Sequence, residues 1–303
     1  MRINNKQQIN KIISCLCIML FSVLHLGSQN NNEPLFTFGI VADVQYADRD
    51  NSGTRYYRSS PSKLANAVNA FNQQDVAFVL SLGDFINDGF HHLDTLDAIT
   101  DKLNMPLYHV LGNHDFLIYP HRKKDLFSAL NMNQPYYSFV KSKWRFIILD
   151  GNDISLYAHT EGSEKHRQAS EMLKRLHENK APNAREWNGG IGEKQLIWLN
   201  KELITAQRKK EQVIIVCHFP LYSDHASGLL LNATDVRTLI ETYPNVIAYL
   251  NGHVHKNEYF LENGVHYISF RGMVEEEVNA YSVISVFNDY LEIENRDIKL
   301  IGK

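Results

Sequence analysis

Cysteine is scarce in this sequence, which holds only Cys15, Cys17 and Cys217 among its 303 residues. The first two lie in an N-terminal stretch that has the layout of a removable signal. Its removal would leave Cys217 alone, and a single thiol excludes an intrachain disulfide. A chain of this length can instead bury a sizeable hydrophobic core, so it does not need one.

An excess of charge of one sign is also missing. The 31 lysines and arginines nearly balance the 34 aspartates and glutamates, for a formal net charge of −3. Without a long basic stripe, we expect no nucleic-acid partner. Apolar residues make up 44% of the chain, which is ordinary for a globular protein and argues against a disordered or fibrous one.

The one N-terminal apolar run, from Ile12 to about Gly27, is shorter than the roughly 20 residues that a membrane span needs. Basic residues precede it and polar residues follow it, which predicts a secretory signal over residues 1–28 and a domain over residues 34–303. Its cysteines lie at its start and not at its end, which argues against lipidation. We expect a secreted or periplasmic protein without a stable membrane span in the mature chain, the alternatives being a membrane-anchored or a cytoplasmic one.

Apolar runs rich in β-branched and aromatic residues recur along the chain. They cover residues 35–44, 76–85, 107–115, 136–140, 144–151, 213–220, 246–255, 265–270 and 280–287. Helical patterns cover residues 61–71, 93–103, 124–130, 192–207 and 233–241. This alternation predicts an α/β fold whose strands are buried on both faces. Short turns between the last runs predict antiparallel strands that close the fold.

One polar segment, residues 153–190, reads as an insertion, and Glu164–Glu178 within it has helical spacing. An insertion of this length in a compact domain is often a lid on the substrate side.

Polar residues follow the ends of five apolar runs. They are Asp43 and Gln45, Asp84, the run Asn113-His114-Asp115, His218, and the pair His253 and His255. In an open α/β sheet, ligands bind beyond the carboxyl ends of the strands, so we expect these side chains to meet in one crevice. Each one alone has another explanation, such as a turn, a helix cap or a surface histidine. Together they supply oxygen and imidazole ligands for two metal ions.

This ordered set, Asp-x-Gln, Gly-Asp, Gly-Asn-His-Asp, His and Gly-His-x-His, resembles the calcineurin-like metallophosphoesterase superfamily from Phe36 to at least Phe287. The resemblance implies a four-layer α/β/β/α sandwich. The stretches "FGIVADVQYAD", "GTRYYR", "WNGG" and "GVHYISFRGMVE" resemble the manganese-dependent ADP-ribose/CDP-alcohol diphosphatase family, which carries Asp-x-Gln where its relatives carry Asp-x-His. Asp115 stands where many members have Glu. The stretch between Asp48 and Thr54 is short, so base contacts from that loop do not carry over.

The resemblance implies a site with two divalent cations that share Asp84. The first cation would be held by Asp43, Gln45, Asp84 and His255, and the second by Asp84, Asn113, His218 and His253. An amide oxygen is a harder ligand than imidazole. Oxygen ligands suit Mg²⁺ and Mn²⁺ and imidazole suits Zn²⁺ and Fe²⁺, so Gln45 shifts the first site toward Mn²⁺. We expect two Mn²⁺ ions, the alternatives being Mg²⁺, Fe²⁺ and Zn²⁺. A different interpretation of Gln45 is a hydrogen bond near the site.

Two further residues receive catalytic roles in this interpretation. His114 would face the substrate, to protonate the leaving oxygen or to stabilise charge on phosphorus, and Asp115 would orient its ring. The alternative is that His114 only hydrogen-bonds its own loop.

The implied reaction cleaves the phosphoanhydride of small nucleoside diphosphate compounds, giving AMP and ribose 5-phosphate from ADP-ribose, or CMP and a phosphoalcohol from CDP-alcohols. A phosphomonoesterase or phosphodiesterase, and a non-catalytic scaffold, are the alternatives, and the oligomeric state stays open.

Other polar residues near these motifs carry weaker predictions. Those with a possible substrate role are Arg55 and Arg58 as phosphate ligands, Tyr56 and Tyr57 as stacking or packing residues, and Asn188-Gly189-Gly190 as a source of backbone N–H groups or a lead-in to a helix. Those expected to serve the fold or the surface are His91 and His92 at a helix start and Glu275–Glu277 on a solvated face. His225 is expected on the surface, with a place at the mouth of the site as the alternative.

Overall fold

Two six-stranded sheets form the centre of the unit that begins at Leu35. The computed structural model describes residues 33–294 and 298–301, so the signal predicted for residues 1–28 lies outside the described residues. The first sheet has the order β12-β11-β10-β1-β2-β3. Its strands are β1 (Phe36–Val41), β2 (Val79–Ser81), β3 (Leu107–His109), β10 (Ser282–Val286), β11 (Tyr290–Ile293) and β12 (Ile298–Ile301).

The second sheet has the order β4-β5-β6-β7-β9-β8. Its strands are β4 (Tyr137–Lys141), β5 (Trp144–Ile148), β6 (Gln212–Val216), β7 (Val246–Asn251), β8 (Glu258–Glu262) and β9 (Val265–Ser269). Strands β1 to β3 of the first sheet run parallel, as do β5, β6, β7 and β9 of the second. The hairpins β8–β9 and β10–β11 are antiparallel, as the short turns predicted.

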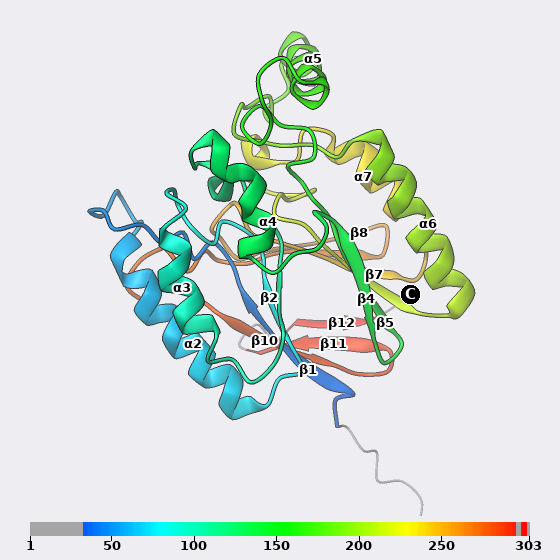
Figure 1. The fold of residues 1–303 in the computed structure, drawn as a ribbon. Helices are drawn as coiled ribbons and strands as arrows, with labels where there is room; N and C mark the ends of the chain where they lie inside the picture. The colour runs from blue at the N-terminus through cyan, green and yellow to red at the C-terminus, as the bar shows by residue number, and fades with distance from the viewer. Residues whose placement is uncertain (1–32, 295–297, 302–303) are drawn as a thin grey trace, which may run out of the picture. The chain divides into compact units, whose positions relative to one another are not determined.

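Helices cover the outer face of each sheet (Figure 1). Those on the first sheet are α2 (Ser60–Gln74), α3 (His92–Thr100) and α4 (Leu126–Ala129), and those on the second are α6 (Glu193–Lys209) and α7 (Ala233–Ile240). The insertion holds α5 (Glu164–Glu178), with the bounds that its spacing predicted. Short 3₁₀ helices cover Tyr57–Ser59, His114–Phe116, Pro120–Asp125 and Ala226–Gly228. The predicted four-layer α/β/β/α order is therefore confirmed.

The core between the two sheets is rich in aromatic rings. Phe38 of β1 stacks on Phe78 with ring centroids 5.1 Å apart, and it meets Phe146 of β5 edge to face at 5.3 Å. Alternate residues of β1 point the other way, so that Val41 packs against α2 residues such as Leu64. Burial on both faces explains why the central strands are almost continuously apolar.

The edge strands β3 and β4 lie in predicted apolar runs, but the edge strand β8 does not. In β8 only alternate residues are shielded, because one face meets solvent, and no continuous apolar run marks it. Among the described residues, no helix combines the length and the apolar character that a membrane span requires.

Candidate active site

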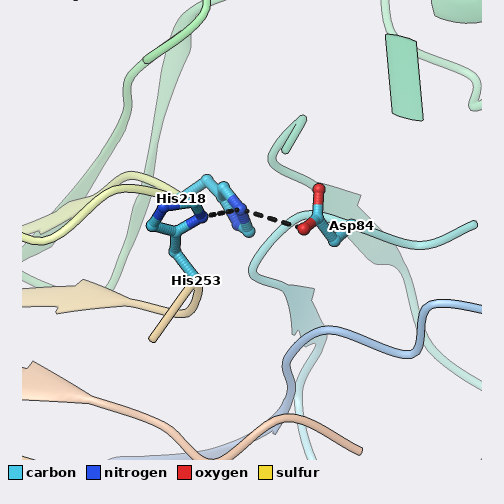
Figure 2. A group of neighbouring side chains, drawn as sticks. All are labelled: Asp84, His218 and His253. Carbon is cyan, nitrogen blue, oxygen red and sulfur yellow. Dashed lines mark hydrogen bonds and ion pairs between the residues drawn. The ribbon is translucent and has the colours of Figure 1, made fainter. Parts of the chain in front are cut away.

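Five strands from both sheets end at one place, and each is followed by a predicted ligand. Asp43 and Gln45 follow β1, Asp84 follows β2, and Asn113 follows β3. From the second sheet, His218 follows β6, and His253 and His255 follow β7. Figure 2 shows Asp84 of the first sheet facing His218 and His253 of the second. The carboxyl ends of the strands thus converge as expected.

Asp84 belongs to two groups of possible ligands at once. One group joins it to His218 and His253 and the other to Asp43 and His255, with the ligand atoms of each group within 4.8 Å of one another. Oδ2 of Asp84 lies 3.3 Å from Nε2 of His218, and Oδ1 of Asp43 lies 3.2 Å from Nε2 of His255. The arrangement fits two neighbouring cations with Asp84 between them.

The two predicted amide ligands have free acceptor atoms. Oε1 of Gln45 and Oδ1 of Asn113 are buried and have no hydrogen-bond partner among the described residues. A buried polar atom without a partner is costly, because it has lost its water. A hard cation would satisfy both oxygens, so the donor set fits Mn²⁺ or Mg²⁺. The contact of Gln45 Nε2 with Asp84 Oδ2, at 3.5 Å, is long for a hydrogen bond.

Each histidine ring of the site has one nitrogen fixed by an oxygen outside the ligand set. Nδ1 of His218 donates to the carbonyl of Leu82 at 2.8 Å, and Nδ1 of His255 donates to Glu275 at 2.7 Å. In His253 the other nitrogen, Nε2, donates to Oδ1 of Asn188 at 3.2 Å. Such bonds select the tautomer whose second nitrogen is free to bind a metal.

Most of the predicted ligands lie on a strained backbone. Asp43, Gln45, Asp84, His253 and His255 have positive φ angles of 47°, 46°, 51°, 69° and 56°. Residues other than glycine rarely adopt this region, and strain of this kind concentrates at functional sites. Glycines make room for the carboxylates, since a Cβ on Gly112 would lie 2.1 Å from Oδ1 of Asp84 and one on Gly252 2.5 Å from Oδ2 of Asp43.

The titration of the site shows its attraction for positive charge. Burial alone would raise the pKa of Asp84, but the imidazoles of His218 and His114 outweigh it and hold this pKa well below its usual range. Burial lowers the pKa of His218, but the Asp84 carboxylate more than reverses this and the pKa is about 9. His253 is the exception, because burial and the neighbouring His218 hold its pKa well below its ordinary value. Positive charge is therefore stabilised directly beside Asp84, where the predicted cations would lie.

The prediction for Asp115 is wrong in its partner. Its buried carboxylate accepts from the backbone N–H groups of Gly112, Asp84, Phe85 and Ile86, at 2.8–3.1 Å, and so ties the second and third strand ends together. The ring of His114 is held instead by the carbonyl of Asn87, 3.0 Å from Nδ1. His114 itself lines the pocket, as predicted, so Nε2 is the nitrogen that can face a substrate.

A pocket of about 670 Å³ opens over the predicted metal ligands. Arg55, Trp187 and His225 line it together with Asp84, so the insertion contributes to the substrate side. Arg58 is directed elsewhere, because its guanidinium pairs with Asp48 at 2.6 Å and with Asp50 at 2.5 Å.

The structure confirms some of the remaining predictions for polar and aromatic residues and corrects others. His92 begins α3, as expected, and Tyr57 packs in a small buried cluster. Glu275 does not lie on a purely solvated face, because it holds His255. The buried side chain of Asn188 contacts His253, and the backbone N–H groups of Asn188 and Gly190 donate to the carbonyls of Arg185 and Ile154.

Comparison with known proteins agrees with this geometry. The sequence model of the calcineurin-like phosphoesterases matches residues 36–257. Manganese-dependent ADP-ribose/CDP-alcohol diphosphatase of Arabidopsis thaliana is 34% identical to the chain, covering 89% of it and 94% of the plant protein. The human protein of that name is 30% identical, covering 88% and 92%. A dimetal phosphatase from Danio rerio has a TM-score of 0.82 at 28% identity, covering 89% of this chain and 100% of its own.

The chain belongs to the calcineurin-like phosphoesterases and, among them, to the family of the manganese-dependent ADP-ribose/CDP-alcohol diphosphatases.

Proposed function

We propose that the protein is a manganese-dependent hydrolase that cleaves the phosphoanhydride bond of nucleoside diphosphate-linked compounds. The observation that carries the proposal is the double ligand group around Asp84, completed by the free amide oxygens of Gln45 and Asn113. The named activity of the relatives identifies the bond. A full set of oxygen and imidazole ligands in an open pocket argues against a non-catalytic scaffold.

Asp43, Gln45, Asp84 and His255 would hold one cation, and Asp84, Asn113, His218 and His253 the other. Bound there, the two cations supply Lewis-acid activation of water and of a phosphoryl oxygen. Asp84 offsets the repulsion between two positive charges by its own negative charge. Its Oδ1 also accepts from the backbone N–H of His114 at 2.7 Å, which fixes the carboxylate in place.

His114 can hold or donate a proton at the reacting phosphoryl group. With Nδ1–H donated to the Asn87 carbonyl, Nε2 faces the pocket. Its task is modest, because a phosphate monoester is a good leaving group. Overall, one water adds across the P–O–P bond, so ADP-ribose gives AMP and ribose 5-phosphate, and a CDP-alcohol gives CMP and a phosphoalcohol.

The test is product analysis by chromatography with Mn²⁺ at neutral to mildly alkaline pH. ADP-ribose should give AMP and ribose 5-phosphate, and CDP-choline should give CMP and phosphocholine, without inorganic phosphate or free nucleoside as a first product. A much higher kcat/KM on simple phosphomonoesters or phosphodiesters would establish the alternative esterase function. Full metal loading without turnover of any of these substrates would establish a scaffold.

We further propose export of the protein, on the layout of residues 1–28 alone. The expected result is an intact mass of the native protein that corresponds to a chain starting near residues 28–30. A mature cytosolic chain that begins at Met1 would contradict it.

A further inference from the structure

Glu275 lies in the segment between β9 and β10, and its side chain is 15% exposed. Its Oε1 faces two groups that serve different parts of the site. Nδ1 of His255 lies 2.7 Å away, and Nε of Arg55 lies 3.6 Å away. One carboxylate oxygen therefore contacts both a predicted metal ligand and the arginine of the substrate pocket.

Backbone pairing fixes this carboxylate beside Arg55. Residues 54–56 run antiparallel to residues 274–276, with an antiparallel bridge between Arg55 and Glu275. The N–H of Tyr56 donates to the carbonyl of Val274 at 2.8 Å, and the N–H of Glu276 donates to the carbonyl of Thr54 at 2.7 Å. The two side chains thus leave neighbouring strands of a short ribbon, where opposite charges attract each other.

A buried lysine also holds the segment that carries Glu275. Nζ of Lys63, on α2, donates to the carbonyl oxygens of Met273, Glu275 and Glu276 at 2.7, 3.4 and 2.5 Å. Lys63 is 4% exposed. A buried ammonium with three carbonyl partners leaves the segment little freedom, because each lost bond would leave a buried polar group without a partner.

Arg55 remains accessible at the pocket, with 37% of its side chain exposed, and it lines the pocket together with His255 and Asp84. A diphosphate substrate has two phosphoryl groups, and only one of them reacts. The other keeps its negative charge, and a guanidinium can bind it through two parallel hydrogen bonds.

We propose that Glu275 is a positioning residue with two functions: it orients His255 for the cation, and it directs Arg55 to the non-reacting phosphoryl group of the substrate. The second function rests on the proposed diphosphatase activity, and the first does not. Loss of a carboxylate that fixes a metal-binding histidine typically weakens metal binding or activity by about 10- to 100-fold.

The experiment compares Glu275→Ala, Glu275→Gln and Arg55→Lys with Glu277→Gln, which changes an exposed carboxylate of the same segment. Mn²⁺ affinity is measured by titration calorimetry and by the electron paramagnetic resonance signal of free Mn²⁺, and KM and kcat are measured with ADP-ribose. Glu275→Ala should weaken Mn²⁺ binding at one of two sites by about 10- to 100-fold. Glu275→Gln should weaken it less, because its amide oxygen still accepts from His255.

The substrate function separates from the metal function in the same variants. Both Glu275 variants and Arg55→Lys should raise KM, and Arg55→Lys should leave Mn²⁺ affinity unchanged. Glu277→Gln should change neither quantity. Unaltered Mn²⁺ affinity in a folded Glu275→Ala protein would overturn the first function, and an unaltered KM in both Glu275 variants would overturn the second.

Failure of the proposed activity is recognised separately. If the wild type binds two Mn²⁺ ions but hydrolyses no diphosphate, the diphosphatase proposal and the second function both fail, and the Mn²⁺ titrations still decide the first. Thermal melts of each variant identify misfolding. If Glu275→Ala misfolds, Glu275→Gln, which keeps the volume of the side chain, replaces it in the Mn²⁺ titration.

Discussion

Oδ1 of Asn188 lies 3.2 Å from Nε2 of His253, so the insertion and the end of β7 meet in one hydrogen bond at the proposed metal site. Asn188 is fully buried, and its Nδ2 donates to the carbonyls of Asn183 and Ser227. The Asn188 side chain therefore joins the insertion, which lines the pocket, to the ring of a predicted ligand and fixes the orientation of that ring.

Asn188→Ala should weaken Mn²⁺ binding by about 10-fold, because His253 loses the acceptor that selects its tautomer. Titration with Mn²⁺ measures this, and Asn179→Ala, at an exposed position of the same insertion, is the matched control. Equal Mn²⁺ affinities in the two variants would show that His253 needs no such partner.

Asp84→Asn should reduce kcat/KM for ADP-ribose by at least about 10²-fold, because the amide leaves two cations without a charge between them. Metal analysis should find fewer ions per chain in this variant than the nearly two of the wild type. Asp94→Asn, on the exposed side of α3, should keep both ions and full activity. Full activity of the wild type after complete removal of metal would contradict the dinuclear mechanism.

Gln45→His should raise activity with Zn²⁺, Fe²⁺ or Co²⁺ relative to Mn²⁺, since imidazole suits these ions better than an amide oxygen does. The ratio of rates in metal-depleted protein reloaded with each ion is the measurement. Gln73→His, at an exposed position of α2, controls for an added histidine. Unchanged ratios would mean that Gln45 does not bind the cation.

Arg145→Met tests stability away from the site. The nearly buried guanidinium pairs with Glu202 at 2.7 Å and with Glu211 at 2.8 Å. Its loss removes the charged partner of two shielded carboxylates, of which Glu202 keeps only the hydroxyl of Ser138 as a donor among the described residues. The free energy of unfolding should fall by about 3 kcal/mol in urea titrations, with Mn²⁺ affinity unchanged. Arg208→Met, exposed on α6, should change little, and equal losses in both variants would contradict a specific role for the buried pairs.

The convergence of the predicted ligands could be foreseen from the sequence, because the ends of the strands can be located in it. Asp84 and His218 are far apart in the chain, yet each directly follows an apolar run, and the carboxyl ends of such strands converge. The fold followed from the same runs and from the superfamily resemblance. The edge strand β8 was missed because its burial is one-sided and its apolar pattern is weak.

The partners of the ligands were not predictable, because they come from irregular segments without periodicity. Glu275 lies 20 residues after the histidine it holds, and Asn188 lies 65 residues before His253. The error over Asp115 has a local cause. Residues 114–116 form a 3₁₀ turn, and adjacent side chains on a helical turn point in different directions, so sequence neighbours do not face each other.

Five predicted ligands lower the stability of the fold by their left-handed backbone, while their side chains serve the proposed activity. They are Asp43, Gln45, Asp84, His253 and His255. Each such residue is held at a cost on the order of 1 kcal/mol or more, and glycine would adopt the same conformation without strain. Selection for a longer-lived fold alone would therefore favour glycine at these positions, in contrast to selection for metal binding. A descendant of this chain that no longer needed its reaction should lose its ligands first at these positions, and its fold should persist after its chemistry is lost.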